Sequence, residues 1–214
     1  MRILTPLEGR VLGVLVEKQA TVPDTYPLSL NALVAGCNQK TTRDPVMAAD
    51  DADVLAALDG LKSMSLVFEV SGSRVVRFEH NFARVFGVPG AAVALLAVLM
   101  LRGPQTAAEL RLNSERLHRF ADIGSVEAFL EEMATKEPPL AVHLARAPGA
   151  REARWAHLLC GAVAAPSAAQ GASDDDIVSV GELVALRSEQ ARLAAELESL
   201  RALVQRMAAE LGIQ

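Results

Sequence analysis

The sequence of 214 residues is short of cysteine and of aromatic side chains. Its two cysteines, Cys37 and Cys160, lie far apart and in no spacing typical of a metal site. We expect both to be reduced and buried as small apolar residues, with a disulfide between them as the alternative. Only 4% of the residues are aromatic while 51% are hydrophobic, so Ala, Val and Leu dominate the expected core, which favours helices over a β-sandwich.

A long hydrophobic run is also missing. The longest, residues 91–101, is well short of the ~20 residues that a membrane span needs, and Arg102 ends it. The N-terminal MRILTPLEGR contains no apolar stretch long enough for a signal peptide. We therefore expect a cytoplasmic protein with no membrane partner.

The chain has no excess of positive charge. Its net charge is −5, which argues against a protein that coats nucleic acid without specificity. Residues 81–165 carry 9 Lys/Arg against 8 Asp/Glu, whereas residues 166–214 carry 4 against 8. The acidic surplus is therefore concentrated in the C-terminal tail.

The first 80 residues predict three helices followed by a β-hairpin. Thr5 and Glu8 are spaced as a capping box, and apolar side chains at helical spacing follow to about Gln19. Three helices and a hairpin, in this order, are typical of a winged helix. The expected elements are helices at about 5–19, 30–37 and 50–64 and strands at 66–70 and 74–78, with a turn at 71–73.

The same order of elements returns in the second half. Thr106 and Glu109 again have the spacing of a capping box, and Pro148-Gly149 indicates a turn between two strand-like segments. We therefore predict a mainly α fold with small β-hairpins (α+β), built from two tandem winged-helix domains at residues 1–82 and 83–161. The second set of expected elements is helices at 91–101, from 106, and at 125–134, and strands at 140–145 and 152–158.

The C-terminal tail combines a linker with a heptad repeat. Residues 162–176 are rich in Ala, Pro, Ser and Gly and indicate a flexible linker, and residues 177–214 predict one helix. Its a and d positions are apolar except for Gln190, which favours a parallel two-stranded coiled coil and hence a homodimer. The alternative is an amphipathic helix packed on its own domain. The predicted dimerisation residues are Leu183, Leu186, Gln190, Leu193, Leu197, Leu200, Val204, Met207 and Leu211.

Several short motifs in the first 161 residues are distinctive together, namely GRVLGVLVEK (9–18), YPLSLNALV (26–34), CNQK (37–40), RDPV (43–46), LRGPQT (101–106), RLHRF (116–120), PPL (138–140), PGARE (148–152) and HLLCG (157–161). They resemble the YceH family of uncharacterised bacterial proteins. The resemblance covers about residues 3–161 and implies a tandem winged-helix fold, but it implies no established activity. Ala107-Ala108 stands where that family more usually has Pro-Gly, and Trp155 where it has Tyr.

The residues that catalysis or cofactor binding would need are scattered. The four histidines lie in different expected elements, and His157 with Cys160 forms a lone H-x-x-C, half a metal site at most. The sequence contains no phosphate-binding glycine loop and no nucleophile motif. The three aspartates at 174–176 precede the tail helix, where carboxylates act as caps. We expect neither enzyme activity nor a cofactor.

Charge on the third helices disagrees with a DNA-binding role. In winged-helix proteins this helix usually enters the major groove and needs a basic or amide-rich face. Here its expected exposed face is acidic in both halves, which opposes an approach to phosphates. The exposed residues expected there are Asp50, Asp51, Asp53, Asp59 and Lys62 in the first half and Glu127, Glu131, Glu132 and Lys136 in the second.

Positive charge gathers instead on the expected wings and on the segments before the third helices. The stretch NQKTTRDPV (38–46) would present Lys40 and Arg43 to phosphate. An equally good interpretation is that Arg43 pairs with groups at a helix end and that Asn38 caps the second helix. The candidate nucleic-acid-binding residues are Lys40, Arg43, Arg74, Arg77, Arg116, Arg119, Arg146, Arg151 and Arg154.

Two functions are consistent with these patterns. The fold favours, by a small margin, a DNA-associated regulator that contacts the phosphates of double-stranded DNA through basic wings and turns. The alternative is an adaptor that binds another protein through its acidic third helices and its coiled-coil tail, without binding DNA. Neither function involves catalysis.

The full-length protein is expected to be a homodimer in solution, and truncation after Ser173 is expected to give a folded monomer. Each Leu of the heptad contributes roughly 1.5–3 kcal/mol when buried, before the cost of ordering the chain. Changing Glu182 and Glu196 to Lys should weaken the dimer modestly, because it opposes them to Arg187 and Arg201. Light scattering measures both effects, and a full-length monomer at tens of micromolar would mean that the apolar stripe packs within one chain.

Overall fold

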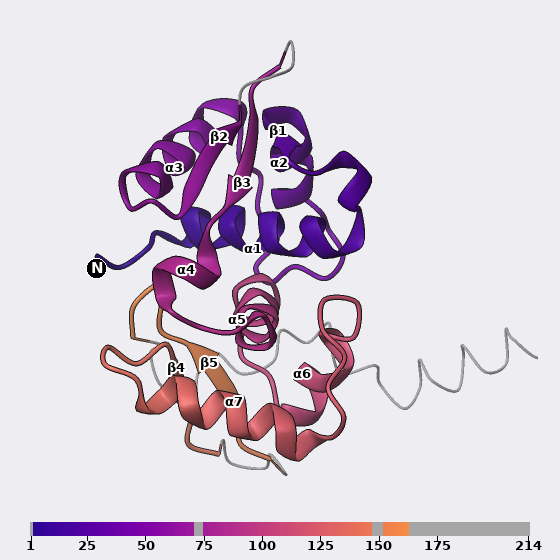
Figure 1. The fold of residues 1–214 in the computed structure, drawn as a ribbon, viewed down its shortest axis with the longest axis vertical. Coiled ribbons are helices and arrows are strands. Elements are labelled where there is room, and N and C mark those ends of the chain that lie inside the picture. The colour runs from indigo at the N-terminus through magenta and orange to yellow at the C-terminus, as the bar shows by residue number, and fades with distance from the viewer. Residues whose placement is uncertain (1, 71–74, 147–151, 163–214) are drawn as a thin grey trace, which may run out of the picture. The chain divides into compact units, whose positions relative to one another are not determined.

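A computed structural model describes residues 2–70, 75–146 and 152–162. Within these ranges it contains seven α-helices and five short strands, which confirms the predicted mainly α fold with small antiparallel hairpins (Figure 1). None of these helices combines the length and the hydropathy that a membrane crossing requires. All the described residues belong to one compact unit. The predicted heptad helix lies outside the described residues, and so does the predicted linker beyond residue 162.

The first half consists of three helices and a three-stranded antiparallel sheet. The predicted capping box begins its first helix: Thr5 Oγ1 accepts from the Glu8 amide at 3.2 Å, and Glu8 Oε2 accepts from the Thr5 amide at 2.8 Å. The sheet has the order β1-β3-β2. The elements are α1 (Pro6–Thr21), β1 (Leu28–Ser29), α2 (Leu30–Cys37), α3 (Asp51–Ser63), β2 (Val67–Val70) and β3 (Arg77–His80), with a 3-10 turn at Pro23–Thr25.

The second half repeats this order after a short helix. An isolated bridge between Gln105 and Trp155 takes the place that β1 has in the first half, because each joins the segment before the second helix to the return strand. The repeated order is compatible with two winged helices. The elements are α4 (Phe82–Phe86), α5 (Gly90–Arg102), α6 (Ala107–Asn113), α7 (Ile123–Thr135), β4 (Ala141–His143) and β5 (Trp155–His157).

The strands differ from the prediction more than the helices do. The return strand of the first hairpin, expected from residue 74, begins at Arg77. Val75 and Val76 before it are 55% and 52% exposed, so their β-branched side chains do not pack on the core. β1 has only two residues, too few for an alternating pattern, and only its pairing with β3 defines it.

The two halves share one core, in which α1 packs against α5 (Figure 1). α5 is buried along residues 91–101. A glycine permits the close approach, since a Cβ on Gly13 would lie 3.0 Å from Leu101 Cγ. Main-chain hydrogen bonds also cross between the halves, from the Asp44 amide to the Leu101 carbonyl at 2.8 Å and from the Leu4 amide to the Leu159 carbonyl at 2.9 Å.

The two cysteines are free thiols in different surroundings. Cys37 is fully buried in α2, as predicted, whereas Cys160 at the end of the second hairpin is only half-buried. Burial raises the pKa of both thiols to about 11. The expectation of two buried thiols is therefore confirmed for Cys37 and needs correction for Cys160.

Gly36 is expected to tolerate no side chain, because a Cβ there would stand 2.6 Å from Cγ1 of Val14 on α1. Val is stiff at χ1, so the two helices must separate. We expect Gly36→Ala to lower the free energy of unfolding by about 1–3 kcal/mol. The matched control is Gly124→Ala in α7, where the nearest atom is Asp122 Oδ1 at 3.6 Å, and it should stabilise by about 0.4–1 kcal/mol. Urea unfolding followed by circular dichroism measures both, and equal effects would contradict this packing.

Candidate functional site

The stretch 38–46 connects α2 to the segment before α3. Hydrogen bonds from its own polar groups hold its conformation. The Asn38 main chain caps α2, with its amide donating to the Val34 carbonyl. The Asn38 side chain makes two hydrogen bonds to the Ala49 main chain: Nδ2 donates to the carbonyl at 2.8 Å and Oδ1 accepts from the amide at 2.9 Å. Asn38 therefore has the capping role that the sequence offered as one alternative.

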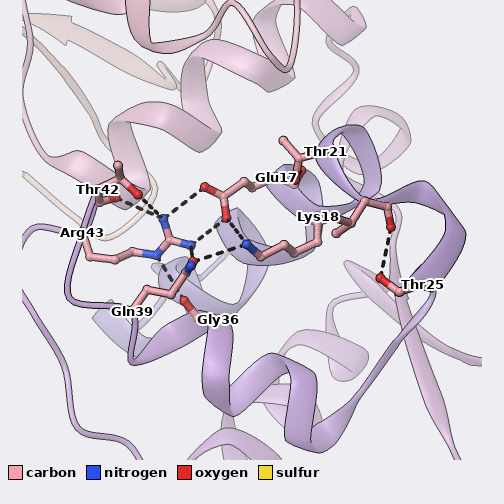
Figure 2. A network of polar contacts seen from close by, with 9 residues as sticks. Glu17, Lys18, Thr21, Thr25, Gly36, Gln39, Thr42 and Arg43 are labelled. Carbon is pink, nitrogen blue, oxygen red and sulfur yellow. Dashed lines mark hydrogen bonds and ion pairs between the residues drawn. The ribbon is translucent and has the colours of Figure 1, made fainter. Parts of the chain in front are cut away.

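Arg43 lies at the centre of a polar network under this stretch (Figure 2). Its guanidinium forms a bidentate pair with Glu17 of α1, Nη2 to Oε2 at 2.6 Å and Nη1 to Oε1 at 3.1 Å. Nε donates to the Gly36 carbonyl at 3.2 Å, and Nη2 also donates to Gln39 Oε1 at 2.6 Å. Nη1 donates as well to the Thr42 carbonyl at 3.0 Å. Each nitrogen of the guanidinium thus has a partner within the protein.

Glu17 is held between two cations. Besides Arg43, Lys18 Nζ lies 3.2 Å from its carboxylate. Burial by itself raises the pKa of Glu17, but the hydrogen bonds from Arg43 and the charges of Arg43 and Lys18 outweigh it, so the pKa is lowered. Because the folded pKa is below the unfolded one, this carboxylate stabilises the fold above the ordinary glutamate pKa. That contribution is lost as the pH falls through the folded pKa.

A second arginine fixes the stretch from α1. Arg10 is 1% exposed; its Nη1 donates to the Cys37 carbonyl at 3.2 Å and its Nη2 to the Pro45 carbonyl at 2.7 Å. Its Nε has no hydrogen-bond partner among the described residues. Burial and the positive charge of Arg43 both lower the pKa of Arg10. Arg10 therefore holds the main chain just before the stretch, at Cys37, and near its end, at Pro45. Together with Arg43, it fixes the whole stretch.

The structure corrects the prediction that Arg43 contacts phosphate. The side chain of Arg43 is 0% exposed and is paired with Glu17. Its bond to the Gly36 carbonyl confirms the alternative, in which Arg43 pairs with a group at a helix end. Lys40 in the same stretch is exposed, and its contact with phosphate stays a prediction.

Two further candidate arginines are fixed on the protein while staying partly exposed. Arg77 of β3 donates to the carbonyls of Thr25 at 3.0 Å and Pro27 at 2.7 Å. Arg154 pairs with Glu109 of α6 at 3.1 Å, with half of its side chain exposed. The other candidates are either exposed, namely Lys40, Arg116, Arg119 and Arg146, or outside the described residues, namely Arg74 and Arg151.

The third helices α3 and α7 expose carboxylates, as predicted. The lysines expected beside them are engaged: Lys62 pairs with Asp59 and Glu69. Lys136 donates to the Gly87 carbonyl at 3.1 Å. A DNA strand approaching either helix would therefore meet negative charge. The exposed carboxylates are Asp50, Asp51, Asp53 and Asp59 on or next to α3 and Glu127, Glu131 and Glu132 on α7.

The second half carries a partly apolar groove, which we call the α6–α7 groove. It consists of two hollows with volumes of about 310 Å³ and about 280 Å³, which share Ala108 and Ile123. Phe120 lines the first hollow and Trp155 of β5 the second. Ile123 is 43% exposed and Leu112, in the first hollow, is 73% exposed. The groove thus runs from the α6–α7 turn across the first turns of α6 and α7 to the second hairpin.

The described residues show no grouping suited to metal chemistry. In these ranges no three His, Cys, Asp or Glu side chains come together as metal ligands would. His157 has an Nδ1 with no hydrogen-bond partner among the described residues, and burial lowers the pKa of this imidazole to about 4. Cys160 Sγ lies 3.6 Å from the Thr5 carbonyl that it contacts. The H-x-x-C pair therefore packs at the end of the hairpin.

Comparison with known proteins places the chain in a family. Residues 4–150 match the model of a family described as a protein of unknown function, DUF480. The chain belongs to this family. The DUF480 match includes both sets of three helices and ends before β5.

Relatives of the DUF480 chain match its tail as well. A UPF0502 protein of Leptothrix cholodnii is 66% identical over 99% of this chain and 97% of its own length. UPF0502 proteins of Burkholderia pseudomallei and Burkholderia multivorans are 66% and 67% identical over 100% of this chain and 91% of their own length. The predicted membership of a family of uncharacterised bacterial proteins is confirmed, while the narrower YceH label stays a prediction.

The predicted dimerisation residues, from Leu183 to Leu211, lie outside the described residues, so the dimer stays a prediction. Sequence reasoning missed Arg10 and Glu17, which hold the 38–46 stretch. A signal for Arg10 was present, because it lies within the run GRVLGVLV, all of which is buried. A charge inside such a run needs internal partners.

Arg43→Met is expected to lower the free energy of unfolding by about 3 kcal/mol, because it leaves Glu17 without its main partner in a partly buried position. The double variant Glu17→Leu with Arg43→Met should lose clearly less, since no unpaired carboxylate remains. Lys40→Met, on the exposed side of the same stretch, should stay within about 0.5 kcal/mol of the parent. Urea unfolding of the four proteins measures this, and a double variant that loses as much as Arg43→Met or more would contradict the coupling.

Proposed function

We propose that this DUF480 protein is a non-catalytic adaptor that binds another protein. The observation that carries the proposal is the chemistry of the second half's third helix and wing. In a DNA-binding winged helix this surface faces the duplex. Here the beginning of α7 and the adjacent hairpin present Ile123, Glu127, Glu152 and Trp155 around one hollow.

A mixed surface of this kind is typical of protein interfaces. Their centres are apolar and their rims are polar. DNA binding instead depends on cations that neutralise phosphates. Of the positive residues that the sequence pointed to, Arg43 is buried and Arg154 is already paired with Glu109. The small preference for DNA that came from the fold is therefore reversed.

A DNA-associated regulator is the second candidate, supported by a specific observation. Lys40, Arg116, Arg119 and Arg146 are exposed. Arg116 and Arg119 lie on the turn between α6 and α7, so phosphates would bind beside the third helix rather than along it.

Titration with a random duplex of about 30 base pairs separates the two candidates. The adaptor should show no binding by fluorescence anisotropy at about 150 mM salt and only weak binding at about 50 mM. A regulator would bind tightly at low salt and lose affinity steeply as salt is raised. In that case Arg116→Ala with Arg119→Ala should weaken binding, and Glu131→Ala with Glu132→Ala should leave it unchanged or strengthen it. Such a result would overturn the adaptor proposal.

A further inference from the structure

The α6–α7 groove is charged oppositely at its two ends. Arg111 and Arg119 line the first hollow, where Glu115 is the only carboxylate among the lining residues. Glu127 and Glu152 line the second hollow, which has no Lys or Arg among its lining residues. The end at the α6–α7 turn is therefore positive and the end at the hairpin negative.

The arginines around the groove differ in how the protein holds them. Arg154, the sequence neighbour of two residues that line the second hollow, has its charge balanced by Glu109. Arg111 Nη2 donates to the Ala121 carbonyl at 3.1 Å, which positions its guanidinium while the residue stays exposed. Within the described residues Arg119 has neither a hydrogen bond nor an ion pair, so its charge is available to a ligand.

The middle of the groove is apolar. Ala108 and Ile123 belong to both hollows, and the exposed Leu112 lies beside them. Each hollow is close to the lower end of the ~300–1,000 Å³ range of ligand pockets, which suits one or two anchoring side chains. An exposed apolar strip between two charged ends can bury an apolar side chain from a partner, and such a central anchor supplies much of the affinity of a protein interface.

We propose that the α6–α7 groove binds a short segment of a partner protein with three parts: acidic residues at one end, an apolar residue in the middle and basic residues at the other end. The inference rests on the proposed adaptor function and names its binding surface. The acidic end faces Arg111 and Arg119, the apolar side chain packs on Ile123, and the basic end faces Glu127 and Glu152. Duplex DNA does not fit, because it is negative along its whole length and would meet the carboxylates at the hairpin end.

The test uses random peptides of about twelve residues displayed on phage and selected on the full-length protein. Selected peptides should carry acidic and basic clusters on opposite sides of an apolar residue. Synthetic copies, measured by calorimetry, should lose about tenfold or more in affinity with Arg119→Glu and with Glu127→Lys. The variant with both changes should bind peptides whose acidic and basic clusters are exchanged. Glu132→Lys is the matched control, since Glu132 is exposed on α7 but does not line the groove, and it should leave affinity unchanged.

Three outcomes would overturn the inference in distinguishable ways. Selected peptides whose affinity ignores Arg119→Glu and Glu127→Lys would place the binding surface elsewhere, and the adaptor function would stand. Selection of no peptide, together with duplex binding that Glu127→Lys strengthens, would mean that the groove takes nucleic acid and that the adaptor proposal fails too. A change of oligomeric state with Glu127→Lys would identify a second copy of this chain as the occupant.

Discussion

The ion pair between Glu17 and Arg43 fixes the stretch through which the first half bonds to the last turn of α5. It joins α1 to the stretch that follows α2, and Arg43 also holds Thr42, whose φ of 61° is unusual for a β-branched residue. Asp44, the residue after Arg43, donates its amide hydrogen to the Leu101 carbonyl in the last turn of α5. A pair between α1 and the stretch after α2 thus positions the segment that bonds to the other half. Removing this ion pair would therefore affect both halves of the protein.

Much of the fold could be predicted from short-range signals. The capping boxes at Thr5 and Thr106 placed the starts of α1 and α6, because their geometry is local to four residues. The strands were predicted less well: β1 exists only through its pairing with β3, more than 45 residues later. Such pairing depends on tertiary contacts that a local pattern does not contain.

In the candidate site, too, the sequence predicted the local features but not the tertiary contacts. Sequence placed Arg43 in a polar loop correctly but left two directions open for its side chain, because its partner Glu17 lies 26 residues earlier on another helix. The exposed carboxylates of α7 followed directly from helical periodicity. The α6–α7 groove could not be predicted, since its lining residues come from two helices, a turn and a hairpin between Ala107 and Trp155. Only their packing makes oppositely charged ends part of one surface.

The shared core has a thermodynamic consequence for any ligand. α5 is buried along its length against α1 as well as against α7, so the second half cannot unfold without exposing apolar surface of the first. Binding to the folded state alone stabilises everything that unfolds with the site. A segment seated beside α7 would therefore slow the exchange of buried amide hydrogens in α1, although it touches no atom there. The helices of both halves would report one and the same binding event.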